Sequence, residues 1–335
     1  MRCTIIYLAY AASGALGLVP AAACGPTTRY CYGDAQCPPG YQCTPRGVCA
    51  PGDASAIGDG GLDLDAGTGV DGAGDDGGSG HDRLPRDRGT LADGGQPLCP
   101  AWDGVIEQSE VDYGAGLTGH YRTIDPAQPA NVSLVPQTID GGSLWDFSAA
   151  VPGETSIAVE TFDPAGTWFA ADFPEATYTA LLEDGGDLLG VFRVGVDVLE
   201  MVGVVSLAEG DTELFYDPPV VLFRYPFRVG DRWSTESLVS GVYGRLAAGF
   251  YETYTFEVRA AGKVKVPAGT FDVLEVHLLR LVEVPTLNPY YWITTTAIKY
   301  LFVAQCYGTV ATVGSRDDEE QDPFTVAREY KRLGF

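Results

Sequence analysis

Hydrophobic and polar residues alternate with a period of two along most of the chain from about residue 96 onward. The clearest stretch is 251–260, where every second position is apolar or aromatic, at Tyr254, Phe256, Val258 and Ala260. The positions between them carry mostly polar side chains, including Glu257 and Arg259. This alternation is typical of a β-strand with one side in a core and the other in water.

The same alternation continues on both sides of a turn signal at Pro267-Ala268-Gly269-Thr270. Residues 263–266 precede this turn and residues 271–279 follow it. Proline presets the backbone of the first turn residue, and glycine accepts the left-handed conformation that closes such a turn. The sequence therefore predicts a β-hairpin with a three-residue loop.

Further strands end at turn signals rich in Gly, Asp and Pro, and they are predicted at 156–162, 167–171, 176–182, 188–206 with a break, 213–217, 220–225, 232–240, 290–304, 307–314 and 324–332. No stretch shows a convincing amphipathic helical pattern. Short strands with tight turns predict one all-β domain over residues 96–335. We expect a large antiparallel curved sheet, arranged as a half-barrel or a sandwich.

Two segments resemble a pair of signatures in uncharacterised bacterial envelope proteins. They read Tyr225-Pro-Phe-Arg-Val-Gly-Asp-Arg-Trp-Ser234 and Val266-Pro-Ala-Gly-Thr-Phe271. That group is associated with curved antiparallel sheets related to the half-barrels of periplasmic lipoprotein carriers. The resemblance covers about residues 215–335 and implies a fold and a location in the envelope. Because the matching positions are turn and core residues, it implies no catalytic residue.

Residues 1–23 have the features of a secretory signal peptide: a basic start, an apolar run and three alanines at the end. The apolar run is shorter than the about 20 residues that a membrane-spanning helix needs. Cys24 follows the alanines and resembles the acylated cysteine of bacterial lipoproteins, although Ala21 stands where that family usually has Leu. The residue after it is Gly25 and not Asp, which in Gram-negative lipoproteins implies the outer membrane.

The number of cysteines supports acylation. Cleavage after Ala23 leaves seven of the eight cysteines, so one would be unpaired in an oxidising compartment. Acylation of Cys24 leaves six, which can all form disulfides. The alternative is a plain secreted protein with a free thiol at its N-terminus. We expect an exported chain that an acyl group anchors in the outer membrane.

Residues 24–50 hold the lipid anchor and a small cysteine-rich module. So short a stretch cannot build a hydrophobic core, and we expect two disulfides to stabilise it, formed in one of three pairings by Cys31, Cys37, Cys43 and Cys49. The pieces Asp34-Ala-Gln-Cys-Pro38 and Gly40-Tyr-Gln-Cys43 resemble small modules of the Dickkopf and EGF-like type, which implies no activity. A zinc site is disfavoured because the even spacing lacks close cysteine pairs.

Residues 51–95 consist mostly of Gly, Asp and Ala, with ten Asp, three Arg and no Glu. Such a segment cannot bury enough apolar surface to offset its ordering entropy, and its like charges extend it. We interpret it as a flexible tether with a root-mean-square reach of about 35–40 Å. A calcium-binding loop beginning at Asp63 is the alternative, but Gly67 and Thr68 depart from the ligand and glycine positions of such loops.

The chain carries 45 acidic and 21 basic side chains, a net charge of -24. Binding of nucleic acid needs Lys and Arg to replace counterions, so no nucleic-acid partner is expected. The acidity also argues against docking on phosphate or anionic lipid headgroups. The expected contact with the membrane is therefore the acyl anchor.

Two cysteines lie near the two ends of the β domain, Cys99 at its entrance and Cys306 near its end. A disulfide between them would close a loop of about 200 residues, worth about 4–5 kcal/mol in the chain-entropy model. We expect these two cysteines to form a structural disulfide and not to have a redox role.

The candidates for chemistry in the β domain are few. His277 and Glu275 share one face of a predicted strand and could form an acid–base pair or two metal ligands, but we expect a solvated sheet face. Residues 316–322 form an acidic run that could hold a cation, and we interpret it as a solvated turn. No metal and no cofactor are expected. A hydrolase that uses two carboxylates distant in sequence is an alternative.

Aromatic residues offer a second kind of site. On a concave sheet they could line a groove for a hydrophobic ligand, with the candidate lining residues Phe227, Trp233, Phe256, Trp292, Tyr300 and Phe302. The competing interpretation, which we favour, is that these residues fill the core of a sandwich or closed barrel.

The sequence thus predicts a non-enzymatic lipoprotein with four parts: signal peptide, anchored cysteine module, acidic tether and a structural or binding β domain. The first alternative function is a carrier of a hydrophobic ligand or lipid in an open half-barrel, and the second is the carboxylate-dependent hydrolase. The expected partner is a hydrophobic ligand or another envelope protein.

Overall fold

A computed structural model describes residues 41–43, 49–51, 99–139, 141–182, 186–286 and 291–334. The chain divides into two compact units, residues 1–79 and 80–335. In the first unit, β1 (Tyr41–Cys43) pairs with β2 (Cys49–Pro51) in antiparallel fashion. The predicted signal peptide, the predicted acylation site at Cys24, the disulfides expected in the cysteine module and the tether predicted at 51–95, apart from Pro51, lie outside the described residues.

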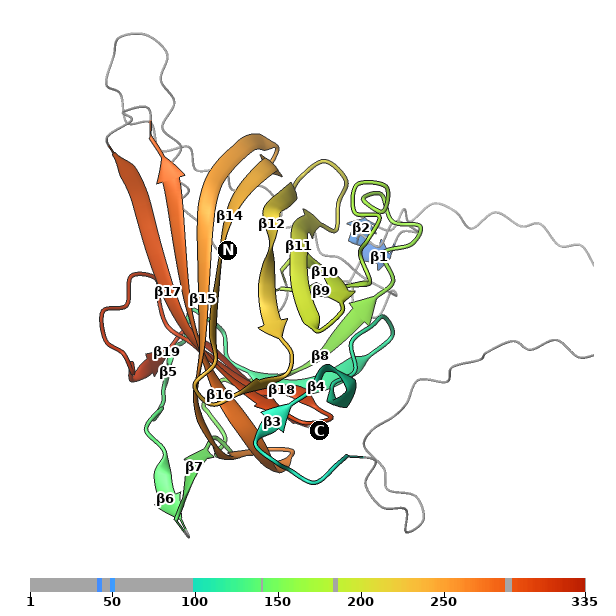
Figure 1. Ribbon diagram of the computed structural model, residues 1–335. Coiled ribbons are helices and arrows are strands. Elements are labelled where there is room, and N and C mark those ends of the chain that lie inside the picture. The colour runs from blue at the N-terminus through green and yellow to red at the C-terminus, as the bar shows by residue number, and fades with distance from the viewer. Residues whose placement is uncertain are drawn as a thin grey trace, which may run out of the picture. The chain divides into compact units, whose positions relative to one another are not determined.

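The second unit confirms the predicted all-β domain with a large, curved antiparallel sheet (Figure 1). Its main strands are β4 (Thr118–Thr123), β8 (Thr155–Phe162), β9 (Tyr178–Leu181), β10 (Leu188–Gly195), β11 (Val198–Ser206), β12 (Glu213–Arg224), β14 (Arg232–Tyr243), β15 (Leu246–Val266), β16 (Gly269–Pro285), β17 (Trp292–Ala304), β18 (Gly308–Gly314) and β20 (Glu329–Leu333). They pair in the order β14-β12-β11-β10-β9-β8-β4-β20-β18-β17-β16-β15.

The curved sheet closes on itself. β15 pairs with β14 as well as with β16, so the first and last strands of the order are joined into a barrel of 12 strands. Closure satisfies the backbone donors and acceptors that an open half-barrel leaves at its two edges. The β14–β15 hairpin that closes the barrel pairs without interruption from Tyr243–Leu246 to Arg232–Glu257.

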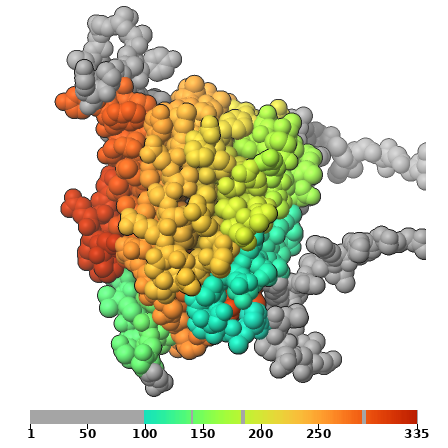
Figure 2. Space-filling model, in the orientation of Figure 1, coloured from blue at the N-terminus to red at the C-terminus, as the bar shows by residue number. Residues whose placement is uncertain are grey.

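Shorter strands cover the barrel from outside or extend it. They are β3 (Val105–Ile106), which pairs with β13 (Phe227–Arg228), β5 (Ala130–Asn131), which pairs with β19 (Val326–Ala327), and β6 (Gln137–Ile139), which pairs with β7 (Gly142–Asp146). β7 also pairs in parallel with the end of β15. Figure 2 shows the start of this unit, in cyan, packed against the yellow and orange strands. Within the described part of the chain, no helix is long and apolar enough to cross a membrane.

The strands β3 to β7, which precede residue 156, were not predicted, and three predicted features differ in detail. The predicted hairpin exists, but Val266 pairs directly with Gly269, so its loop has two residues. The strands expected at 213–217 and 220–225 are one strand, β12, whose prolines lie where the pairing with β11 shifts register, a place where a strand tolerates proline. The strand expected at 167–171 is wrong, because this segment forms turns that bury Phe169 and Phe173.

The inner face of the barrel is packed with apolar and aromatic side chains. The largest buried cluster draws on strands from β9 to β17 and contains Phe223, Trp233, Val239, Phe256 and Val276 among others. The ring centroids of Trp233 and Phe256 lie 5.3 Å apart in a stacked arrangement. Side chains of this cluster alternate with outward-facing ones along each strand, as the period of two requires.

Two smaller clusters lie on the other face of the sheet. One is formed between β15–β18 and the covering segments, with Trp145 and Phe147 packed edge-on against Phe302. The other joins Phe169 and Phe173 to side chains of β10 and β11. The sheet is therefore buried on both faces in these regions, whereas the outer side elsewhere remains open to solvent.

The predicted disulfide is present. Cys99 and Cys306 are bonded across a sequence separation of 207 residues, with their Cα atoms 5.9 Å apart. It joins the start of the β domain to the turn between β17 and β18. Because the loop it closes is so long, the disulfide lowers the conformational entropy of the unfolded chain and stabilises the folded state by about 4–5 kcal/mol in the chain-entropy model.

Candidate functional site

A row of polar side chains crosses four strands on the outer face of the barrel. The strand register places Arg232 of β14 beside Glu257 of β15, Glu257 beside His277 of β16, and His277 beside Tyr300 of β17. Their chain neighbours, such as Trp233 and Phe256, belong to the inner cluster. Alternation therefore directs the whole row outward.

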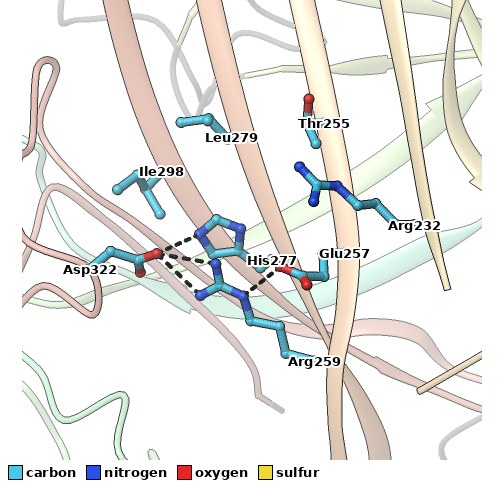
Figure 3. A pocket seen from close by; sticks show the side chains of 8 residues that line it. All are labelled: Arg232, Thr255, Glu257, Arg259, His277, Leu279, Ile298 and Asp322. Carbon is cyan, nitrogen blue, oxygen red and sulfur yellow. Dashed lines mark hydrogen bonds and ion pairs between the residues drawn. The ribbon is translucent and has the colours of Figure 1, made fainter. Parts of the chain in front are cut away.

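This row borders a half-open pocket of about 240 Å³. Thr255, Leu279 and Ile298 form the next row on the same face and also line the pocket, as does Asp322 from the loop after β18. The complete lining is Arg232, Thr255, Glu257, Arg259, His277, Leu279, Ile298 and Asp322. In Figure 3, His277 lies in the middle, with Arg232 on one side and Ile298 and Asp322 on the other.

A β-bulge in β15 positions Arg259. The pairing of β15 with β16 shifts by one residue between Val258 and Ala260, which leaves Arg259 as the extra residue. Bulges re-aim side chains and are common beside functional sites. The shift also corrects one expectation: Ala260 packs against the outer cluster and not on the face of Phe256.

The guanidinium of Arg259 connects the sheet to the loop. Its Nε donates to Oε2 of Glu257 at 3.1 Å, and its Nη2 donates to Oδ2 of Asp322 at 3.2 Å. Its Nη1 donates to the hydroxyl of Tyr300 at 3.3 Å and also to Asp322. All three nitrogen atoms thus have acceptors within this site.

Asp322 is the last residue of the predicted acidic run. Most of residues 316–322 are exposed, as expected of a solvated turn, but Asp322 reaches back over the sheet. It accepts hydrogen bonds from Tyr300 and Arg259. Burial raises the pKa of Asp322, but these hydrogen bonds outweigh that effect and hold it below its ordinary value. The carboxylate is therefore ionised at neutral pH.

His277 forms the floor of the pocket and is only 7% exposed. Its Nε2 lies 3.2 Å from Oδ2 of Asp322, within ion-pair distance, yet the angles are not those of a hydrogen bond. Burial and the charge of Arg259 lower the pKa of His277, and Asp322 and Glu257 oppose this only in part. The neutral form of the imidazole is thereby favoured, and its Nε2 faces the carboxylate of Asp322.

Glu275 lies on the same face of β16, two residues before His277, and is also 7% exposed. Burial raises the pKa of Glu275 to about 7, with Arg259 acting in the opposite direction and Asp322 adding to the rise. The expectation of a solvated sheet face for Glu275 and His277 is wrong, because neighbouring side chains and the loop of Asp322 cover them. Glu275, whose pKa lies near neutral pH, is thus buried beside His277.

The six aromatic residues proposed as a ligand lining do not share one surface. Three of them, Phe227, Trp233 and Phe256, pack in the inner cluster. Tyr300 and Phe302 belong to the outer cluster, on the opposite face of the sheet. Trp292 is 46% exposed near the end of the β16–β17 hairpin.

The sequence suggested part of this site and missed the rest. The pairing of Glu275 with His277 on one face was recognisable from their spacing. Asp322 was recognisable only as part of an acidic run, and nothing in the sequence connected it with His277, which lies 45 positions away. Arg259 was assigned to the outer face, but its bulge and its role as a connector depend on the register with β16.

Comparisons with known proteins give no match: no protein-family model, no curated protein and no solved structure is significantly similar to the chain. Among the described residues, no group of three or more His, Cys, Asp or Glu side chains has an arrangement suited to a metal ion.

Proposed function

We propose that the chain is an exported, lipid-anchored lipoprotein of the outer membrane, whose β-barrel is a structural or binding domain and not an enzyme. In this proposal Cys24 carries the acyl anchor, and the acidic tether holds the barrel away from the membrane. The binding partner is a soluble ligand or another envelope protein, which contacts the outer face of the barrel.

The observation that carries the proposal of export is the disulfide between Cys99 and Cys306. Disulfides of this structural kind persist in oxidising compartments and are rare in the cytosol. With these two cysteines paired, an even number remains in the cysteine module, and Cys24 is left over for acylation. The signal-like residues 1–23 agree with this assignment.

A binding role on the outer face is supported by the packing of the barrel. Aromatic and aliphatic side chains of the inner cluster, such as Phe227 and Phe256, are almost fully buried against one another. A carrier that holds a lipid inside the barrel would require these side chains to separate. The polar pocket around His277, in contrast, is open from outside without rearrangement.

Acylation is tested by expressing the full chain in a Gram-negative host and measuring the mass of its N-terminal peptide. We expect acyl groups on Cys24 and recovery of the protein with the outer membrane. Cys24→Ser should release it from that fraction, whereas Cys3→Ser, in the signal peptide, should change nothing. An unmodified N-terminus at Cys24 would contradict the proposal.

The carrier alternative is tested with the same purified protein. A fluorescent fatty acid should gain no more emission with the barrel than with a non-binding control protein, because the inner face is filled. A saturable gain that competes with unlabelled lipid would favour the carrier.

A further inference from the structure

The outer pocket contains one cation without a partner. The side chain of Arg232 is exposed and has neither a hydrogen bond nor an ion pair with any residue that the structure describes. Arg259 lies on the neighbouring strand β15, two residues after Glu257, and is bonded to Glu257, Asp322 and Tyr300. The pocket therefore combines a neutralised guanidinium with a free one, and the free one is directed toward its centre (Figure 3).

The groups around Arg232 divide into a polar and an apolar side. Thr255 lies next to Arg232, and its hydroxyl donates to that of Ser234 at 2.9 Å, because Ser234 donates its own proton to the carbonyl of Tyr254. On the opposite side, Leu279 is 38% exposed and lies beside Ile298. Such a pocket matches a ligand with an anionic head and a short apolar body.

The buried imidazole of His277, a titratable group, forms the floor of the pocket. In the row, Glu257 and Tyr300 flank His277, and Arg232 follows beyond Glu257. Asp322 and Arg259 border the ring from the loop and from β15, and Glu275 precedes His277 by two residues on β16. The two guanidinium groups balance the two carboxylates of Glu257 and Asp322. An added anion beside His277 would therefore favour the protonated imidazole, because it brings the local charge back toward zero.

The size and the charge of the pocket restrict the ligand further. Its volume of about 240 Å³ is below the about 300–1,000 Å³ of pockets for drug-sized molecules. One free guanidinium matches one carboxylate, which it can bind through two parallel hydrogen bonds. A phosphate dianion would place a second negative charge near Glu257 and Asp322 without a cation to compensate it.

We infer that this pocket binds a small organic carboxylate, whose head is held by Arg232 and whose apolar body lies on Leu279 and Ile298. The inference rests on the binding role proposed above and names its ligand class, but it does not depend on the lipid anchor. Binding weakens as the pH rises through about 7, because Glu275 loses its proton there and its carboxylate repels the anion.

The test uses the purified chain and 4-methylpentanoate as the probe, with the ring resonances of histidine followed by NMR. The chain has only three histidines, so His277→Gln identifies the resonance. We expect saturable shifts of the His277 signal with 4-methylpentanoate, and at least about tenfold weaker binding for Arg232→Gln. Arg224→Gln, which removes an exposed arginine elsewhere on the barrel, is the matched control and should stay within twofold.

Two further probes separate the outcomes. Inorganic phosphate and the neutral 4-methylpentanamide should bind at least about tenfold more weakly than the carboxylate. Tighter binding of phosphate, lost in Arg232→Gln, would overturn the ligand class and leave the binding role intact. Equal binding of the amide would exclude the ionic contact. No shift of His277 with any of the three probes would overturn both the inference and the binding role of this pocket.

Discussion

The same strands of the barrel carry two polar networks, one on each face. On the inner face, Glu252 is 1% exposed and accepts hydrogen bonds from Tyr254 at 2.6 Å, from Tyr216 at 3.3 Å and from Arg280. On the outer face, Asp322 accepts from Tyr300 and Arg259. Both networks contain a carboxylate, an arginine and tyrosine, yet their surroundings differ.

The inner network is closed around its carboxylate, although the Nε of Arg280 is buried without a hydrogen-bond partner, and the outer network opens on the pocket. Both oxygen atoms of Glu252 have donors, and those donors come from strands whose register already brings them together. The outer network includes a loop residue, a neutral histidine, and Glu275 with a pKa of about 7. A closed network fixes structure, whereas unshared groups that titrate near pH 7 are suited to binding and proton exchange.

Removal of the inner carboxylate should have the largest effect. We expect Glu252→Gln to lower the free energy of unfolding by about 3 kcal/mol, because the hydroxyls of Tyr254 and Tyr216 lose a charged acceptor and Arg280, whose side chain is 40% exposed, loses its counter-ion. Urea unfolding followed by tryptophan fluorescence measures this loss. Glu236→Gln, at an exposed position of β14, should change stability by less than about 0.5 kcal/mol. Similar values for the two variants would remove the distinction between the faces.

The next effect concerns Glu275 and depends on pH. Its pKa is about 7 in the folded protein against 4.5 as the ordinary value, so between these pH values the folded state binds more protons than the unfolded state. Stability contributed by Glu275 is therefore present below pH 4.5 and is lost as the pH rises through 7. Glu275→Gln should remove this loss. The free energy of unfolding of the variant at pH 8, relative to its value at pH 4, should therefore exceed that of the unchanged protein by about 2–3 kcal/mol. Unfolding curves across this range measure it, and parallel profiles for both proteins would contradict it.

His277 should show a smaller effect of opposite sign. Because its folded pKa lies below the ordinary 6.5, the unfolded state binds more protons in that window. The stability that neutral His277 contributes is present above pH 6.5 and is lost as the pH falls through the folded pKa. His277→Gln should flatten the acid side of the profile and leave the alkaline side unchanged. A change on the alkaline side would mean that His277 and Glu275 titrate as one unit.

The smallest effect on stability is expected for Arg232→Gln. Its side chain is exposed and has no partner among the described residues, so the free energy of unfolding should change by less than about 0.5 kcal/mol. Thermal and urea unfolding at pH 7 measure this value. A loss above 1 kcal/mol would show that Arg232 supports the fold and does not serve ligand binding alone.

The sequence predicted the fold better than the site, for reasons visible in particular residues. Alternation along β15 directed Phe256 inward and Glu257 outward, because a local period of two decides that choice. Closure of the barrel also depends on the pairing of β4 with β20, which places Thr123 beside Lys331, and no local pattern in the sequence indicates a pairing between strands so far apart in the chain. The meeting of Asp322 with His277 depends on a loop that folds back over the sheet, and no spacing rule predicts such a contact.

The extra residue in β15 has a consequence for how this protein can change. Upstream of Arg259 the strand directs Phe256 into the barrel, and downstream it directs Val264 to the outside, against β7 and the outer cluster. Deleting a single residue near this point would reverse every later side chain of the strand. New ligand preferences would therefore have to arise by substitution within a strand of constant length, while insertions and deletions are confined to the loops that border the pocket.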